Sequence, residues 1–199
     1  MNKFLLFALV VLTRIVSLQA YDVEARVAYF IPEDNRLRHI YGNHGFPEYE
    51  LEASMPLCCC CECACDWDAF ANLAYYHKKG HISSCLPAKS EVTHWAFNVG
   101  VKRYFDICEI VRPYLGLGAG FAHVKFHDKS PFVKQHRDKW GVATLIKSGL
   151  RYDVTCNIFL DLFVDYSYHF FNFNRHSCAS VRSVNTGGFK IGLGVGYQF

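Results

Sequence analysis

The sequence lacks an apolar run of the roughly 20 residues that a membrane-spanning helix needs. Its one early run covers residues 4–12, and charged residues make up 20% of the chain. Methionine and proline are scarce, at two and six residues, whereas there are 17 Phe and 12 Tyr. The missing runs and the charge exclude a helical membrane protein, and the aromatic content favours strands over helices.

The first twenty residues differ from the rest of the chain. Lys3 precedes the apolar run at 4–12, and Ala20 stands before a polar stretch, although Arg14 interrupts the pattern. This order is typical of a secretory signal peptide, and a short membrane anchor is the alternative. We therefore expect a signal peptide over 1–20 and one domain over 21–199.

The remainder of the chain repeatedly alternates large apolar residues with small or polar ones. A period of two predicts strands with two unlike faces. Eight segments show this pattern: 23–31, 48–55, 68–75, 94–102, 114–121, 142–151, 160–168 and 189–199.

The apolar faces of these segments could point to a sandwich core or outward into lipid. Their length of about 9–11 residues matches tilted bilayer crossings, and their polar faces are rich in glycine. Aromatics gather near the ends of the apolar faces, as in interfacial girdles. Because lipid offers no hydrogen bonds, such a sheet must close on itself. The predicted fold is all-β, an eight-stranded antiparallel up-and-down transmembrane barrel.

The connections between these segments alternate in length. Long ones are expected at 33–46, 77–92, 127–139 and 171–185, and short ones at 105–110 and 153–157, with 56–66 as an exception. Short turns of such barrels normally lie in the periplasm and long loops outside. The prediction places the protein in the bacterial outer membrane with both termini periplasmic.

The eight dyad-repeat segments and the aromatic residue Phe199 resemble small eight-stranded outer-membrane barrels of Gram-negative bacteria. In that family the final aromatic strand is read by the barrel-insertion machinery, so the resemblance implies an assembly signal at Phe199. The stretches VEARVAYFIPEDNRLRHIYG and YELEAS, with many cysteines, resemble chlamydial-type barrels more narrowly. That resemblance implies disulfide-linked envelope shells but no assigned activity.

Charged residues recur on the faces predicted to line the lumen. An eight-stranded barrel is only wide enough to be filled by side chains, and buried charges must be paired. We expect an ion-pair plug, with a narrow channel for small solutes as the alternative. The predicted network comprises Glu24, Arg26, Glu48, Glu50, Glu52, Asp68, Lys102, Lys147, Arg151, Asp161, Asp165 and Lys190.

The predicted outer loops carry eleven basic and five acidic residues. A basic rim would attract the phosphates of lipopolysaccharide, although an unspecialised solvated rim is the simpler interpretation. Candidate contacts are Arg36, Arg38, Lys78, Lys79, Lys129, Lys134, Arg137 and Lys139. A lipid-modifying enzyme is a third hypothesis, because His81, Ser83 and Glu91, or His176 and Ser177, supply suitable residue types. We expect no cofactor and no nucleic-acid partner.

Ten cysteines fall outside every predicted strand: Cys58, Cys59, Cys60, Cys61, Cys63, Cys65, Cys85, Cys108, Cys156 and Cys178. The periplasm and cell surface are oxidising, so disulfides are expected. Neighbouring cysteines cannot all pair with one another, given the geometry of a disulfide. Intramolecular bridges, cross-links to other cysteine-rich envelope proteins and a thiolate metal site therefore stay open.

Overall fold

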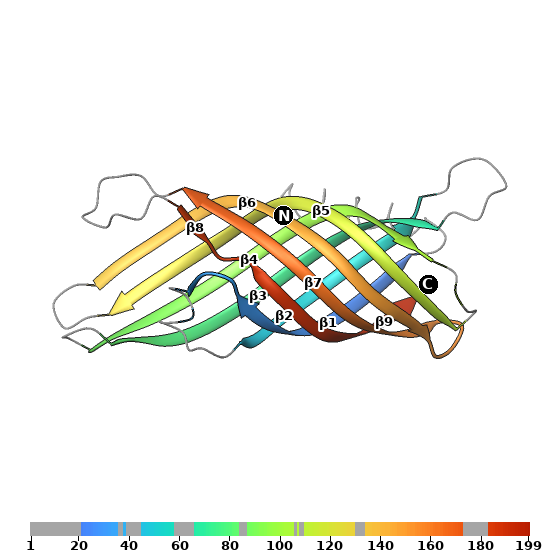
Figure 1. Cartoon of the computed structure of the whole chain (residues 1–199), viewed down its shortest axis with the longest axis horizontal. Helices are drawn as coiled ribbons and strands as arrows, with labels where there is room; N and C mark the ends of the chain where they lie inside the picture. The colour runs from blue at the N-terminus through green and yellow to red at the C-terminus, as the bar shows by residue number, and fades with distance from the viewer. Residues whose placement is uncertain are drawn as a thin grey trace, which may run out of the picture.

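The computed structural model describes residues 21–35, 38, 45–57, 66–83, 87–105, 107, 110–129, 134–172 and 183–199. The strands are β1 (Asp22–Pro32), β2 (Phe46–Pro56), β3 (Trp67–Ser83), β4 (Pro87–Tyr104), β5 (Val111–Lys129), β6 (Lys134–Asp153), β7 (Ile158–Asn172), β8 (Ser183–Asn185) and β9 (Gly188–Gln198) (Figure 1). The described part of the chain contains no helix with the length and apolarity that a membrane crossing requires.

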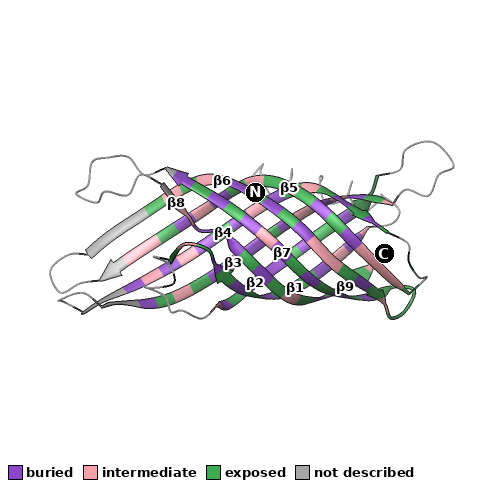
Figure 2. Cartoon of the chain, in the orientation of Figure 1, coloured by how far each residue is buried: buried purple, intermediate pink, exposed green. Residues whose placement is uncertain are grey.

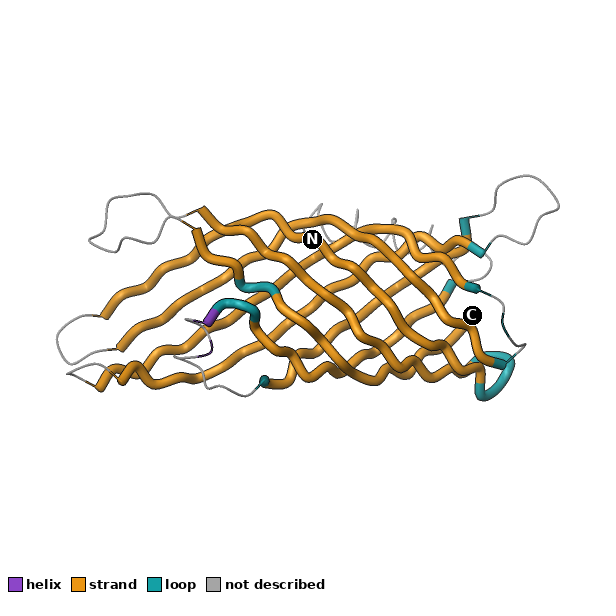
Figure 3. The backbone as a smooth tube through the Cα atoms, in the orientation of Figure 1, coloured by secondary structure: helices purple, strands orange, loops and turns teal. Residues whose placement is uncertain are grey.

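The strands form one closed antiparallel barrel. Neighbours in sequence pair from β1 to β7, and β9 joins β7 to β1, so the ring has no open edge. The short strand β8 also pairs with β7, and only Thr186 and Gly187 separate it from β9 (Figure 3). Strands β8 and β9 therefore share one of the eight strand positions of the ring, and we call each such position a stave. The predicted eight-stranded barrel is confirmed.

Burial alternates along every stave (Figure 2). On β1, Arg26 is 1% exposed whereas its neighbour Val27 is 53% exposed, and on β9 Leu193 is 67% exposed. Charged side chains thus point into the barrel and apolar ones point away from it, which is the reverse of a water-soluble sheet protein. The predicted direction of the two faces is correct.

The predicted loop boundaries on one side are wrong. Strands β3 to β6 are 17, 18, 19 and 20 residues long, against 11 in β1 and in β2. Most of the stretches predicted as loops at 77–92 and 127–139 are therefore paired strands that extend at the left of Figure 1. The apolar alternation marks only the belt on the barrel surface, whereas backbone pairing continues beyond it with polar side chains.

The two ends of the barrel differ. At one end the ring of Tyr21 stacks on Phe199 at 4.5 Å, and the backbone N–H of Phe199 donates to the carbonyl of Tyr21 at 3.0 Å. The turn at 154–157 lies at this same end (Figure 3). We call this the terminal end, and we call the opposite end, where β3 to β6 extend, the hairpin end.

Two rows of outward aromatic residues bound the apolar belt. Towards the hairpin end, Tyr75 packs on Trp95 with ring centroids 4.4 Å apart, and His123 packs on Trp140 at 4.6 Å. Towards the terminal end, Tyr152 lies on β6 twelve residues after Trp140. A strand of that length, tilted as in known barrels, rises about 30 Å, close to the thickness of an apolar bilayer core.

Candidate functional site

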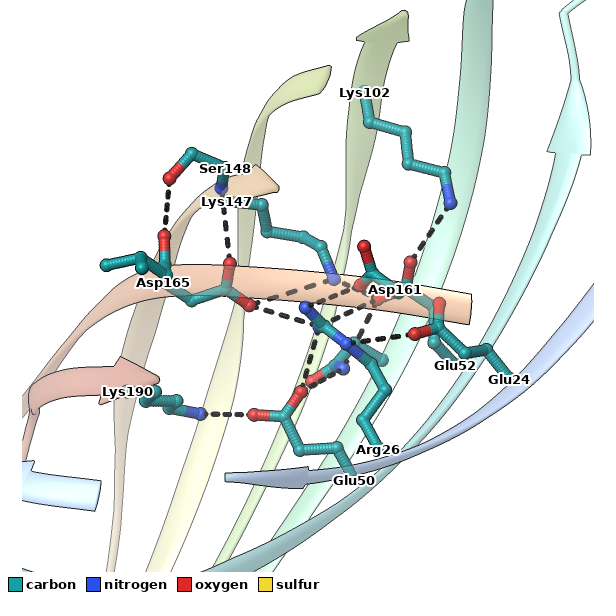
Figure 4. Close-up of polar contacts among 12 residues, drawn as sticks. Glu24, Arg26, Glu50, Glu52, Lys102, Lys147, Ser148, Asp161, Asp165 and Lys190 are labelled. Atoms are coloured by element: carbon teal, nitrogen blue, oxygen red, sulfur yellow. Dashed lines mark hydrogen bonds and ion pairs between the residues drawn. The ribbon is translucent and has the colours of Figure 1, made fainter. Parts of the chain in front are cut away.

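Arg26 on β1 lies at the centre of a buried group of ionic side chains inside the barrel (Figure 4). Its Nη1 atom is 3.0 Å from Glu50 Oε2 and 3.0 Å from Asp165 Oδ2. Its Nη2 and Nε atoms are each 3.3 Å from a further carboxylate, on Asp161 and Glu24. These acids belong to β1, β2 and β7, so one guanidinium ties together staves that are far apart in the sequence.

Three lysines supply the remaining positive charge around Arg26 (Figure 4). Lys102 Nζ lies 3.2 Å from Glu52 Oε1, and Lys147 pairs with the other oxygen of Glu52. Lys190 Nζ lies 2.8 Å from Glu50 Oε1. The lysines come from β4, β6 and β9, so the network reaches around much of the barrel wall.

A second arginine closes the network at the terminal end. Arg151 pairs with Asp22, and its Nε atom is 2.7 Å from Asp153 Oδ1. It also donates to Gln198 Oε1 at 3.0 Å, and its guanidinium lies 3.8 Å from the ring centroid of Phe159. Asp22 was missed by the sequence analysis because the predicted strand began one residue later.

The structure places the twelve residues of the predicted network together on the inner side of the barrel, each less than 9% exposed. Asp68 contributes through its place opposite Lys102 in the β3–β4 register. With Asp22, the described buried residues include eight acids and five basic residues. The excess negative charge requires protons or cations, since isolated buried carboxylates are costly.

Some carboxylate oxygens show where this excess lies. Glu48 pairs with Lys190 through Oε1, but its buried Oε2 has no hydrogen-bond partner among the described residues. The same holds for Asp161 Oδ1, although Asp161 Oδ2 accepts a 2.8 Å hydrogen bond from the hydroxyl of Tyr114. No group of three described His, Cys, Asp or Glu side chains has the geometry of a metal site.

A stack of four rings crosses the interior nearer to the hairpin end. Phe30 stacks on Tyr76 at 5.3 Å, Tyr76 on His94 at 4.6 Å, and His94 on His169 at 4.6 Å. All four side chains are at most 1% exposed, and Phe171 packs edge-on against His94. Sequence analysis did not single out either histidine, although inward positions on alternating strands were the available signal.

The two layers fill the interior. The side chains of Arg26, Lys147 and Lys190 are each 0–1% exposed, so no water-sized space adjoins them. A water-filled pore would leave such charged side chains partly accessible. The arrangement can therefore hold the barrel shut, with the aromatic layer nearer to the hairpin end and the ionic layer nearer to the terminal end.

The predicted lipopolysaccharide contacts occupy several different places. Lys79 is exposed on the outer side of β3, opposite Glu91 in register, whereas Lys78 is half-buried and its Nζ lies 5.8 Å from the ring centroid of Phe46. Lys139 is half-buried on β6. Lys125, which the sequence analysis did not include, is exposed beyond the row of Trp95, His123 and Trp140.

Other predicted contacts are only partly described. Arg38 Nε donates to the carbonyl of Pro32 at 2.6 Å, so this guanidinium is held against the end of β1. The backbones of Lys129, Lys134 and Arg137 lie on β5 and β6 rather than in a loop, but their side chains lie outside the described part. Arg36 lies wholly outside the described residues.

The residues considered for catalysis are not brought together by any described contact. Glu91 lies on β4 within the β3–β4 hairpin. The side chains of His81 and Ser83, and residues His176 and Ser177, lie outside the described part. No described contact therefore supports the hypothesis of an enzyme at the rim.

Of the ten cysteines, only Cys156 is among the described residues. It is exposed in the turn between β6 and β7 at the terminal end, and its thiol is free. The other cysteine predictions concern residues outside the described part.

The barrel resembles known solved structures of the same size. It superposes on Neisserial surface protein A (NspA) with a TM-score of 0.57 at 15% identity, covering 92% of this chain and 100% of that one. The OprG protein of Pseudomonas aeruginosa gives 0.58 at 15% identity, covering 91% and 96%. Ail of Yersinia pestis gives 0.53 at 19% identity, covering 91% and 99%. This chain has the fold of the small Gram-negative outer-membrane β-barrels.

At these identities the likeness establishes the fold alone. No protein-family model matches the sequence, and the sequence is not significantly similar to any curated protein. The narrower resemblance to chlamydial-type barrels is not tested by these structures and stays a prediction.

Proposed function

We propose that residues 21–199 form an integral outer-membrane barrel with a structural and envelope-interaction role, exported by a signal peptide at 1–20. The observation that carries this proposal is the sealed interior within an apolar exterior. Side chains such as Val27 and Leu193 are exposed on the outside, whereas Arg26 is buried at the centre of the network. The sealed interior argues against the alternative of a solute channel, and nothing described supports a rim enzyme.

Planar-bilayer recording of the purified protein tests the sealed interior. We expect no steady conductance from the parent, because fully buried ionic and aromatic layers leave no continuous water path. A double variant, His94→Ala with His169→Ala, removes two rings of the stack and is expected to conduct more often than the parent. Steady conductance from the parent protein would favour the channel and contradict the proposal.

We further propose that the hairpin end faces the cell exterior and binds lipopolysaccharide phosphates. The support is the basic excess in the sequence beyond the aromatic row, together with the exposed position of Lys79 and Lys125. One Ail structure contains the heparin analogue sucrose octasulfate, which is a property of that protein. Here the argument depends on charge, since each basic residue near an anionic surface contributes about 1 kcal/mol.

A double variant with Lys79 and Lys125 changed to Ser tests this surface. We expect about thirtyfold weaker lipopolysaccharide binding at low salt, from about 1 kcal/mol per lysine. Changing Arg112 at the terminal end to Ser is the control, because its guanidinium pairs with Asp153, and it should leave binding unchanged. Equal binding by the double variant and the parent would refute the contact.

The terminal end is proposed to face the periplasm, where its cysteines would cross-link to other cysteine-rich envelope proteins. The exposed free thiol of Cys156 is accessible for such a bond. Non-reducing gels of envelope fractions should show high-mass species that lose intensity on reduction and in the Cys156→Ser variant. A purely monomeric band in the parent would overturn the cross-linking role.

A further inference from the structure

A groove lies on the outer surface of the barrel at its terminal end. It has a volume of about 430 Å³ and runs between outward side chains of β4, β5 and β6, with Val101, Leu115, Leu117 and Ile146 along its walls. These side chains are 38–64% exposed, so no described residue covers them. The volume falls within the range of about 300–1,000 Å³ that is usual for small-ligand sites.

The edge of the groove carries one basic residue and two aromatic ones. Arg103 is the penultimate residue of β4 and lies opposite Trp67 in the β3–β4 register. Its guanidinium carbon is 5.7 Å from the ring centroid of Trp67 and 5.4 Å from that of Phe105. Both rings also line the groove.

No described carboxylate balances the charge of Arg103. Among the described residues it has no carboxylate within ion-pair distance, and its only described contacts are with the two rings. Arg112, at the same end of the barrel, instead pairs with Asp153 at 2.9 Å. A guanidinium at the edge of an apolar belt suits an anion, and its planar fork matches a phosphate.

We propose that this groove binds one phospholipid molecule, with its phosphate on Arg103 and one acyl chain between Val101, Leu115, Leu117 and Ile146. Trp67 and Phe105 lie at the boundary between the two, where aromatic rings are favoured at membrane interfaces. The choice of a phospholipid rests on the proposed orientation, because the terminal end then meets the periplasmic leaflet. The charge complementarity and the position in the apolar belt both point to this occupant.

Native mass spectrometry of the full-length mature protein in detergent, titrated with dioleoyl phosphatidylglycerol, tests the phosphate contact. We expect one lipid to be retained by the parent and about tenfold weaker retention by Arg103→Gln, since hydrogen bonds to charged groups are worth about 1.5–3 kcal/mol. Arg112→Gln removes the same charge at the same end of the barrel, where the guanidinium already pairs with Asp153, and should bind like the parent. If Arg103→Gln retains lipid as well as Arg112→Gln, the proposal is wrong.

A second pair of variants tests the acyl chain. Val101→Trp fills the groove and should lose the retained lipid, whereas Val99→Trp places the same ring two residues away on the same outer face and should not. Both positions face outward, so folding is not expected to distinguish them. Dioleoylglycerol, which has no phosphate, should bind the parent no better than it binds Arg103→Gln.

Two outcomes would overturn this site specifically. Equal retention by Val101→Trp and Val99→Trp would mean that the lipid binds elsewhere on the belt. Tighter retention of lipid A than of phosphatidylglycerol would assign the groove to the other leaflet. Neither outcome changes the conductance test, so a failure here is distinguishable from a failure of the sealed-barrel proposal.

Discussion

Replacing Arg26 by Met should destabilise the barrel more than any other single loss of a basic residue. The substitution keeps an unbranched side chain but removes the charge from a position whose side chain is 0% exposed. Five carboxylates lie within 3.0–3.6 Å of the guanidinium, and its carbon is 3.5 Å from the ring centroid of Phe163. The perturbation therefore leaves several buried acids with less compensation.

The size of the stability loss depends on which of the five carboxylates keep another partner when Arg26 is replaced. Glu50 retains Lys190 at 2.8 Å, and Glu52 retains Lys102 at 3.2 Å. Glu24 has no other ion pair among the described residues, and Asp161 keeps only the hydroxyl of Tyr114. Because breaking one buried pair costs about 3–5 kcal/mol, we expect a loss of that size rather than a multiple of it.

Reversible denaturation in lipid vesicles, followed by tryptophan fluorescence, would measure the change in unfolding free energy. Arg112→Met is the matched control, because its side chain is 30% exposed and its pair with Asp153 is worth about 0–1 kcal/mol. Adding Asp161→Asn to Arg26→Met should restore part of the stability, since one unpaired acid is removed. Acid should reduce the loss as well, because protonation removes charges that the guanidinium balanced.

A loss below about 1 kcal/mol for Arg26→Met, or one equal to that of Arg112→Met, would refute the reasoning. It would mean that water or cations compensate the carboxylates within the lumen. The network would then be no argument for a sealed barrel.

Three further predictions concern the outer face, the inner packing and the chain end. Leu193→Arg on the lipid-facing side should cost about 2–4 kcal/mol in vesicle unfolding, whereas a water-soluble barrel would tolerate it. Gly196→Val should destabilise by about 1–3 kcal/mol, because a Cβ there would overlap the ring of Phe159, and Phe159→Leu in the same chain should recover part of the loss. Phe199→Ala should reduce the amount of barrel in cell envelopes while costing only about 0.5–1.5 kcal/mol in refolded protein, from the lost stack on Tyr21; unchanged envelope levels would contradict its assembly role.

The sequence reveals the lumen more fully than it reveals the outer surface. Inward positions follow from the strand period alone, so Glu24 and Lys190, 166 residues apart in the chain, were both assigned to one interior. Which of them touch could not be predicted, because contacts depend on how the staves are staggered around the ring. For the same reason, the stacking of His94 on His169 could not be predicted, because the two residues come from β4 and β7.

Strand length also depended on the tertiary structure. Lys79 and Lys125 lie on paired strands beyond the aromatic row, where the apolar alternation used to find the strands no longer applies. Hydrogen bonding between neighbouring hairpins maintains the sheet there, and no local pattern signals it. The groove beside Arg103 likewise requires side chains of β3 to β6 to meet on one face.

By itself the sequence determined the period of two, the identity of the inner and outer faces and the number of staves, because these follow from local alternation. Only the tertiary structure decided that Arg26 is the centre of the ionic network, that one ionic and one aromatic layer fill the lumen, and that Arg103 has no carboxylate partner among the described residues. Those features arise from residues far apart in the chain, which closure of the barrel brings into contact.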